Sequence, residues 1–269
     1  MRTTLKKALI FALWLLPIAI VAGIFTGIYT VESSTEETLS LYVEQLGSTD
    51  ILVIITAVQT VGYALFCGFF GYLLAQKLEL WKPFRLETKK VWTTLLVSVV
   101  CGILFSLDYW TFGNIMEEIR GVVQVGLTPV GIVTSILYGG IIEEVMLRLF
   151  FMTLVALILY HIFCKAHKKK RAASKGIFGN LFSKKQPFPT WIFVVANIIS
   201  AFVFAAAHLP ATVMIFGQLT PLILLRCFLL NGGLGLAFGW LYRKHGLVYA
   251  IMAHMLTHIV SKLIWLILI

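Results

Sequence analysis

Long apolar runs dominate the sequence and constrain its fold more than any other feature. The longest covers about residues 128–163, which exceeds the roughly 20 residues that a helix needs to cross a bilayer. Hydrophobic residues make up 59% of the 269 positions and charged residues 13%, whereas a soluble domain carries roughly 25% charged residues. The runs lack the apolar–polar alternation of membrane-spanning strands. The sequence therefore predicts an all-α, polytopic membrane helix bundle.

Seven apolar segments are expected to cross the membrane. An eighth membrane segment is an open alternative, in which 128–138 or 212–225 enters the membrane as a separate segment. Gly139-Gly140 is expected to divide the fourth segment and Asn231-Gly232-Gly233 to interrupt the sixth. Leu209-Pro210 is expected to end the fifth, because proline disfavours helix in the residue before it. The predicted spans are 8–29, 51–75, 91–105, 128–163, 191–208, 221–242 and 247–266. We expect one membrane domain, in which 1–127 contributes three N-terminal spans and 128–269 forms the core.

The loops alternate in charge along the chain. The N-terminus and loops 77–90, 165–185 and 243–245 are basic, whereas 32–50 and 108–120 are acidic or mixed. Because basic loops stay on the cytoplasmic side, the pattern predicts a cytoplasmic N-terminus. The first segment is longer than a signal-peptide core and lacks a clear cleavage site, so we expect an uncleaved span. Short loops favour a bacterial plasma membrane.

The formal net charge of +10 does not indicate nucleic-acid binding. Eight of the 22 cationic side chains lie between Lys165 and Lys185, in one loop beside a span, where lysines determine topology and bind anionic lipid. The four cysteines lie in or beside apolar runs without a CxxC pair. They are expected to be small packing residues rather than disulfide partners or zinc ligands.

The twelve acidic residues all precede Val145, and only Glu143 and Glu144 lie inside a strongly apolar segment. A charge at this depth costs several kcal/mol. Glu144 and Arg148, at i and i+4, can pair along one helix face. Glu143 projects about 100° away, so its carboxylate lacks a local partner and can serve as a general base or acid. A similar pair, Glu117-Glu118, lies in a polar loop and is not expected to be functional.

Three histidines fall in or beside other predicted spans. His208 ends the fifth, and His254 and His258 lie one turn apart on the last, hence on one face. With Glu143 they could activate a water and stabilise an oxyanion. They could instead hold a metal ion, with His208, His254, His258 and Glu143 as ligands. His161, His167 and His245 lie among cations and are not expected to take part.

These residues resemble the three ordered motifs of the CPBP (Abi) family, which comprises CAAX prenyl protease type 2 and bacteriocin-processing intramembrane proteases. The segment from Gly233 to Gly246 also resembles the stretch before the family's third motif, and the resemblance covers about 128–269. The motifs are Glu143-Glu144-x-x-x-Arg148, Phe204-x-x-x-His208 and His254-x-x-x-His258.

The resemblance implies proteolysis within the membrane. Glu143 and His208 would activate a water, Glu144 and Arg148 would shape the site, and His254 and position 258 would stabilise the oxyanion. The family usually has Asn or Asp at the last position, where this chain has His258, whose imidazole can also donate a hydrogen bond. The favoured mechanism needs no cofactor, and a zinc-dependent version stays open.

The favoured function is an intramembrane endopeptidase that acts on a membrane-associated peptide or protein, in peptide or bacteriocin maturation or in self-immunity. Membrane lipids are the other expected partner, and the oligomeric state is left open. One rival is a non-catalytic immunity or scaffold protein, which would tolerate Glu143→Ala. The other is a proton- or metal-coupled transporter, against which the lack of an internal repeat argues.

Overall fold

The structure is a computed structural model that describes residues 2–164 and 189–269. Its regular elements are all helical, as predicted, and the basic loop 165–185 with His167 lies outside the described residues. The helices are α1 (Arg2–Ser33), α2 (Glu36–Leu46), α3 (Thr49–Lys77), α4 (Thr88–Ser106), η1 (Leu107–Tyr109), η2 (Phe112–Asn114), α5 (Glu118–Gly126), α6 (Pro129–Thr134), η3 (Ser135–Glu143), η4 (Val145–Met152), α7 (Thr153–Phe163), α9 (Thr190–Ala207), α10 (Leu209–Phe216), α11 (Pro221–Cys227), η6 (Phe228–Gly232), α12 (Gly233–His245) and α13 (Leu247–Leu268).

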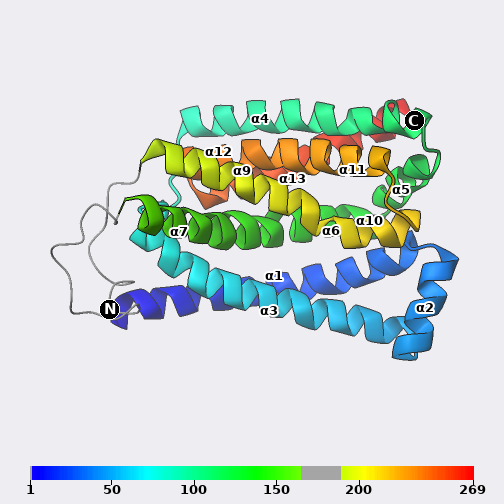
Figure 1. The fold of residues 1–269 in the computed structure, drawn as a ribbon, viewed down its shortest axis with the longest axis horizontal. Helices are drawn as coiled ribbons and strands as arrows, with labels where there is room; N and C mark the ends of the chain where they lie inside the picture. Colours follow the sequence, from blue (N-terminus) through cyan, green and yellow to red (C-terminus); the bar gives the residue numbers. More distant parts are fainter. Residues whose placement is uncertain (1, 165–188) are drawn as a thin grey trace.

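The helices form an elongated bundle with their axes roughly along its length (Figure 1). In the described part of the chain, seven helical segments are long and apolar enough to cross a membrane. The N- and C-terminal ends lie at opposite ends of the bundle (Figure 1), as an odd number of crossings requires. The prediction of seven spans is therefore confirmed, and among the described residues neither 128–138 nor 212–225 forms a separate eighth span.

The outer surface of the bundle is apolar. Large side chains such as Trp14, Val58 and Leu96 are 75%, 66% and 66% exposed, which suits a surface solvated by lipid rather than water. Several hydroxyl groups in the spans bond back to their own helix, as Thr60 does to the Thr56 carbonyl at 2.7 Å and Ser98 to the Thr94 carbonyl at 2.7 Å. These bonds satisfy polar groups that lipid cannot.

The fourth span differs from the prediction that Gly139-Gly140 divides it. Helical structure is continuous from Pro129 to Phe163, and what changes is the hydrogen-bonding register. The turns in η3 and η4 are π-helical, with i→i+5 bonds. The Thr153 hydroxyl donates to the Arg148 carbonyl at 3.1 Å, so a side chain satisfies a backbone acceptor where the α register resumes.

The predicted end of the fifth span and the predicted interruption of the sixth span are also wrong. Pro210 does not terminate the fifth span, because it occupies the first turn of α10, where its missing N–H is not needed. Asn231 and Gly232 form part of the π-helical turn η6 and do not interrupt the sixth span. The expected basic turn, 243–245, is the last turn of α12.

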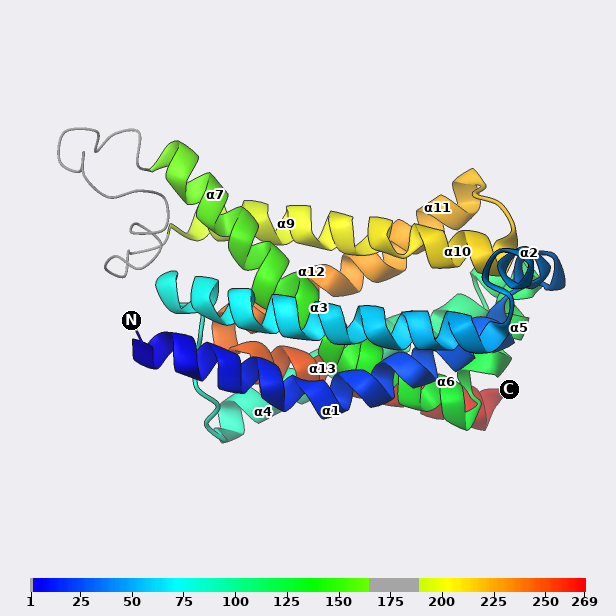
Figure 2. The same cartoon turned by 90° about the horizontal axis from the view of Figure 1, so that it is seen from below.

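Helix α1 packs lengthwise against α3 (Figure 2). Two glycines of α1 allow this close approach: a Cβ added to Gly23 would lie 2.6 Å from Ala57 Cα, and one added to Gly27 would lie 2.7 Å from Val53 Cα. Such small-residue contacts are typical of helix pairs in membranes. Helix α1 also packs on α6 and η3, so the N-terminal spans support the segment that carries the glutamates.

We predict opposite effects for the same substitution at two glycines. Gly23→Ala should lower the free energy of unfolding by about 1–3 kcal/mol, the range for overpacked cores, because the new methyl group meets the backbone of α3. Gly62→Ala meets no atom within 4 Å and should be neutral or stabilising by up to about 1 kcal/mol through helix propensity. Unfolding in mixed micelles, followed by circular dichroism, measures both changes. Equal effects would contradict the close α1–α3 packing.

Candidate active site

A cavity of about 320 Å³ lies between the ends of several helices. Its walls come from α1, α4, η1, α5, the α6–η3 segment, α9, α10, α11, η6, α12 and α13. It extends to the bundle end that carries α2 and α5. Glu143, His208, His254 and His258 line it. The two remaining predicted site residues, Glu144 and Arg148, lie behind this wall and are 0% and 1% exposed.

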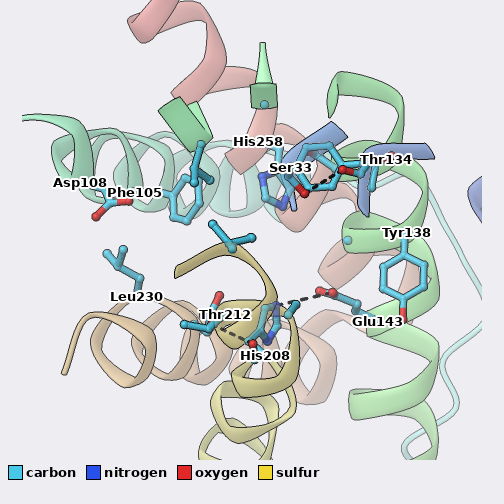
Figure 3. A pocket seen from close by; sticks show the side chains of 18 of the residues that line it. Ser33, Phe105, Asp108, Thr134, Tyr138, Glu143, His208, Thr212, Leu230 and His258 are labelled. Carbon is cyan, nitrogen blue, oxygen red and sulfur yellow. Dashed lines mark hydrogen bonds and ion pairs between the residues drawn. The ribbon is translucent and has the colours of Figure 1, made fainter. Parts of the chain in front are cut away.

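Glu143 and His208 face one another across the cavity (Figure 3). Glu143 Oε1 lies 3.7 Å from His208 Nε2, and the two side chains are 14% and 30% exposed. Glu143 comes from the π-helical segment η3, and His208 joins α9 to α10. Residues 65 positions apart in the sequence thus form a partly accessible pair.

The contact made by Nδ1 of His208 determines whether Nε2, which faces Glu143, is a hydrogen-bond donor or an acceptor. Nδ1 lies 2.8 Å from the Phe204 carbonyl oxygen, which can only accept, so Nδ1 carries the proton. In the neutral ring Nε2 is then an acceptor, as is the ionised carboxylate of Glu143. A molecule with two O–H groups, such as water, can donate one hydrogen bond to each of these two acceptors. Because the acceptors are 3.7 Å apart, its oxygen atom can lie about 2.8 Å from both of them.

The carboxylate of Glu144 connects two cationic or potentially cationic groups. Its Oε1 lies 3.1 Å from an Arg148 guanidinium nitrogen and 2.9 Å from His254 Nδ1. The i,i+4 pairing predicted for Glu144 and Arg148 is therefore present. The His254 contact was not predicted, because the sequence suggested that the histidines would serve Glu143.

Arg148 is held in place by aromatic rings and a backbone acceptor. Its guanidinium lies 4.6 Å from the centroid of the Phe204 ring and 5.7 Å from that of Phe238. It also donates to the Gly235 carbonyl at 3.1 Å. A Cβ on Gly235 would lie 3.2 Å from this guanidinium, so the lack of a side chain at this position favours the close approach. Cation–π contacts are strongest when, as here, the cation is desolvated.

His254 and His258 present their rings to the same small space. The rings stack with centroids 5.0 Å apart, and Phe238 stacks on the other face of His254 at 4.5 Å. A Cβ on Gly139 would lie 3.1 Å from His258 Nε2 and 3.8 Å from His254 Nε2. Since Gly139 has no side chain, both nitrogens border an open volume beside the glutamate-bearing helix.

The geometry of these rings does not favour a shared metal ion. Ligand lone pairs lie in the plane of an imidazole and must converge on a metal at about 2.0–2.1 Å. The His254 and His258 rings are stacked with planes that differ by only 25°, so their lone pairs lie in two separate, nearly parallel planes and do not converge on one point. His254 Nδ1 is engaged by Glu144. Within residues 2–164 and 189–269, no three His, Cys, Asp or Glu side chains form a group able to hold a metal ion.

Two charged features of the cavity were missed from the sequence. Asp108, assigned to a mixed loop, is 2% exposed and pairs with Arg226 through nitrogen–oxygen distances of 2.8, 3.1 and 2.5 Å. Lys262 is 6% exposed and lines the same cavity. The sequence could have indicated Lys262 as a cavity residue, because it continues the four-residue spacing of His254 and His258. No sequence pattern linked Asp108 to Arg226.

Glu118, Arg120 and the four cysteines do not line the cavity. Glu118 is exposed in the first turn of α5 rather than in the expected loop, and Arg120 donates to Asn114 at the surface. The cysteines Cys67, Cys101, Cys164 and Cys227 are free thiols.

A comparison with protein-family models matches residues 124–260, about half of the chain, to the family described as type II CAAX prenyl endopeptidase Rce1-like. The chain belongs to this family. The Rce1-like match includes all three motifs of the cavity and confirms the resemblance drawn from them. Comparisons with curated proteins and with solved structures find no match. Family and fold together identify a multi-pass membrane protein and an intramembrane endopeptidase.

We predict that Gly139→Ala lowers peptide cleavage at least about tenfold, which corresponds to roughly 1.4 kcal/mol. The added methyl group would occupy the volume between the two Nε2 atoms. It would meet only the edge of the His258 ring closely, so thermal stability should change little. Gly140→Ala is the contrasting variant, because its Cβ would meet Met255 and should destabilise the fold. Unchanged kinetics in Gly139→Ala would contradict a role for this space.

We also predict a charge-balance effect behind the cavity. Arg148→Met should cost about 3–5 kcal/mol, as is typical when one partner of a buried ion pair is removed, because Glu144 keeps its charge without the guanidinium. The double variant Glu144→Gln/Arg148→Met should be less destabilised than Arg148→Met alone. Unfolding free energies of the wild type, Glu144→Gln, Arg148→Met and the double variant measure this difference. A double variant as unstable as the sum of the single variants would show that the two side chains are not coupled.

Proposed function

We propose that the protein hydrolyses peptide bonds of membrane-associated peptides or proteins by means of a water activated by Glu143. The observation that carries this proposal is the 3.7 Å separation of Glu143 Oε1 from His208 Nε2, at the wall of a cavity of about 320 Å³. Two acceptors at this spacing can orient the two O–H groups of one water.

The proposed reaction begins when Glu143 takes a proton from the water. The water oxygen bonds to the carbonyl carbon of the substrate, and the carbonyl π electrons move to its oxygen. When the tetrahedral intermediate collapses, the C–N bond breaks and the proton on Glu143 passes to the leaving nitrogen. The products are a carboxylic acid and an amine, and Glu143 is again ionised.

His254 and His258 are proposed to donate hydrogen bonds to the developing oxyanion. His258 Nδ1 is buried and has no hydrogen-bond partner among the described residues, which favours the tautomer with the proton on Nε2, since an orphaned acceptor is more readily tolerated than a donor. The Glu144 carboxylate at His254 Nδ1 is proposed to favour uptake of a second proton from water by His254 as negative charge develops on the oxyanion, as a carboxylate favours the imidazolium that forms in hydrolytic triads. Both Nε2 atoms can then donate, and His258 replaces the Asn or Asp of relatives.

The alternatives are weaker on specific grounds. A zinc-dependent version would need the stacked rings of His254 and His258 to separate and converge. A non-catalytic immunity or scaffold protein gives no reason for two acceptors to face each other in a cavity. A transporter would not account for membership of an endopeptidase family.

The proposed setting is a bacterial plasma membrane with the N-terminus in the cytoplasm. The basic loop 77–90 and the basic end of α12 lie at the N-terminal end of the bundle, and the cavity extends to the other end (Figure 1). Under the positive-inside rule the cavity therefore faces outward. Substrates in maturation of secreted peptides or in bacteriocin self-immunity fit this side of the membrane.

We predict that Glu143→Gln and His208→Gln each lower cleavage by at least about 100-fold, the lower end of the range for general acid–base catalysis. Both variants keep the shape of the side chain they replace approximately, so the fold should persist. Glu118→Gln, which neutralises an exposed glutamate, is the matched control and should cleave normally. The assay uses a library of apolar peptides with protein in lipid nanodiscs, with products identified by mass spectrometry. Cleavage that survives both active-site substitutions would overturn the proposal.

A second measurement separates the metal-independent reaction from the zinc version. Cleavage should be unchanged after prolonged incubation with a chelator, because no step of the proposed mechanism uses a metal ion. Loss of cleavage with recovery on adding Zn²⁺ would instead establish the zinc version.

A further inference from the structure

Lys262 is a buried cation on the wall of the cavity. It lies on α13 and is 6% exposed, yet its side chain lines the same space as Glu143 and His208. Its Nζ lies beside Gly126, on which an added Cβ would be 3.6 Å away, and 5.9 Å from the centroid of the Trp265 ring. A lysine with this degree of burial is rare unless it is paired.

No carboxylate of the described residues lies within 4.0 Å of Lys262 Nζ. The acidic residue that shares this part of the cavity is Asp108, and both of its oxygens are engaged by Arg226. Segment 165–188 contains no Asp or Glu, so it cannot provide an anion either. The Trp265 ring offsets only part of the cost of burying the ammonium group, which is several kcal/mol for an uncompensated ion.

The position of Lys262 relates it to the reaction centre. His254, His258 and Lys262 occupy i, i+4 and i+8 of one helix, so all three face the cavity. The helical rise of about 1.5 Å per residue places Lys262 about 6 Å along the axis beyond His258. Figure 3 places His258 on the side of the cavity opposite His208. A peptide held at the Glu143–His208 pair can therefore extend past the histidines to Lys262.

We propose that Lys262 binds a carboxylate of the substrate peptide and so helps to select and align the chain for cleavage. This inference rests on the proposed function, since it identifies the anion that the unpaired ammonium group would receive when substrate enters. The carboxylate can be the free C-terminus of the peptide or an Asp or Glu side chain, which have the same chemistry. Lys262 is a binding residue in this scheme and takes no part in proton transfer.

The test measures binding apart from cleavage. Glu143→Gln protein, which should bind without cleaving, is titrated in phosphatidylcholine nanodiscs with fluorescent apolar peptides. Matched pairs differ only in a C-terminal carboxylate or amide, or in one internal Glu or Gln. The carboxylate member of one pair should bind about tenfold more tightly, as expected for a hydrogen bond to a charged group of roughly 1.5 kcal/mol, and the pair that discriminates identifies the source.

Substitutions at position 262 assign the effect to this side chain. In the Glu143→Gln background, Lys262→Met should abolish the preference for the carboxylate peptide, and Lys262→Arg, which keeps the charge, should retain it. Lys89→Met, which removes an exposed lysine, should leave the preference intact. If neither peptide pair is discriminated, or if Lys262→Met still discriminates, the inference is overturned. The inference is also overturned, in favour of a lipid headgroup, if the protein with Lys262 retains phosphatidylglycerol, Lys262→Met does not, and neither peptide pair is discriminated.

Failure of the inference can be told apart from failure of the proposed function. Carboxylate-selective binding in Glu143→Gln together with no cleavage by the wild type would retain the subsite and reject the protease mechanism. Cleavage by the wild type that does not depend on the peptide carboxylate would retain the mechanism and reject the subsite.

Discussion

The rest of the site depends on the contacts that the buried carboxylate of Glu144 makes with Arg148 and His254. One of its oxygens contacts both Arg148 and His254, so a single charge joins the π-helical segment to α13. Arg148 extends the connection to α12 through the Gly235 carbonyl and to α9 through Phe204. Four parts of the bundle are thereby fixed around a group that lipid could not solvate. Removing any one charge would leave another buried without compensation.

The two adjacent glutamates consequently have different tasks. Glu144 is fully buried and its contacts are structural, whereas Glu143 is 14% exposed and faces His208. The π-helical turn that carries Glu143 begins beside α6, and such turns are frequent at functional sites. A rigid ion pair next to an open, partly accessible carboxylate is the arrangement expected when a catalytic group needs a fixed geometry without being neutralised by its neighbour.

The sequence predicted those features that depend on local spacing. Apolar run length gave the seven spans, and the four-residue spacing gave the Glu144–Arg148 pair and the common face of His254 and His258. It could not predict the partner of His254, because that depends on how α13 packs on η4. Asp108 and Arg226 are 118 residues apart, and no local pattern connects them. The π register and the restart of helix at Pro210 were also missed, since glycine and proline indicate a break only by average preference. The division of the chain at residue 128 stays a prediction, although α1 packs on the predicted core.

Oxygen isotopes test the central claim, that Glu143 activates water rather than attacking the substrate itself. The wild-type protein is allowed many turnovers on a peptide that it cleaves in H₂¹⁸O, and both the product and the protein fragment that contains Glu143 are analysed by mass spectrometry. The account predicts one ¹⁸O atom in the new carboxylate of the product and none in the side chain of Glu143. Incorporation of ¹⁸O into Glu143 would indicate an acyl-enzyme anhydride and would contradict the account.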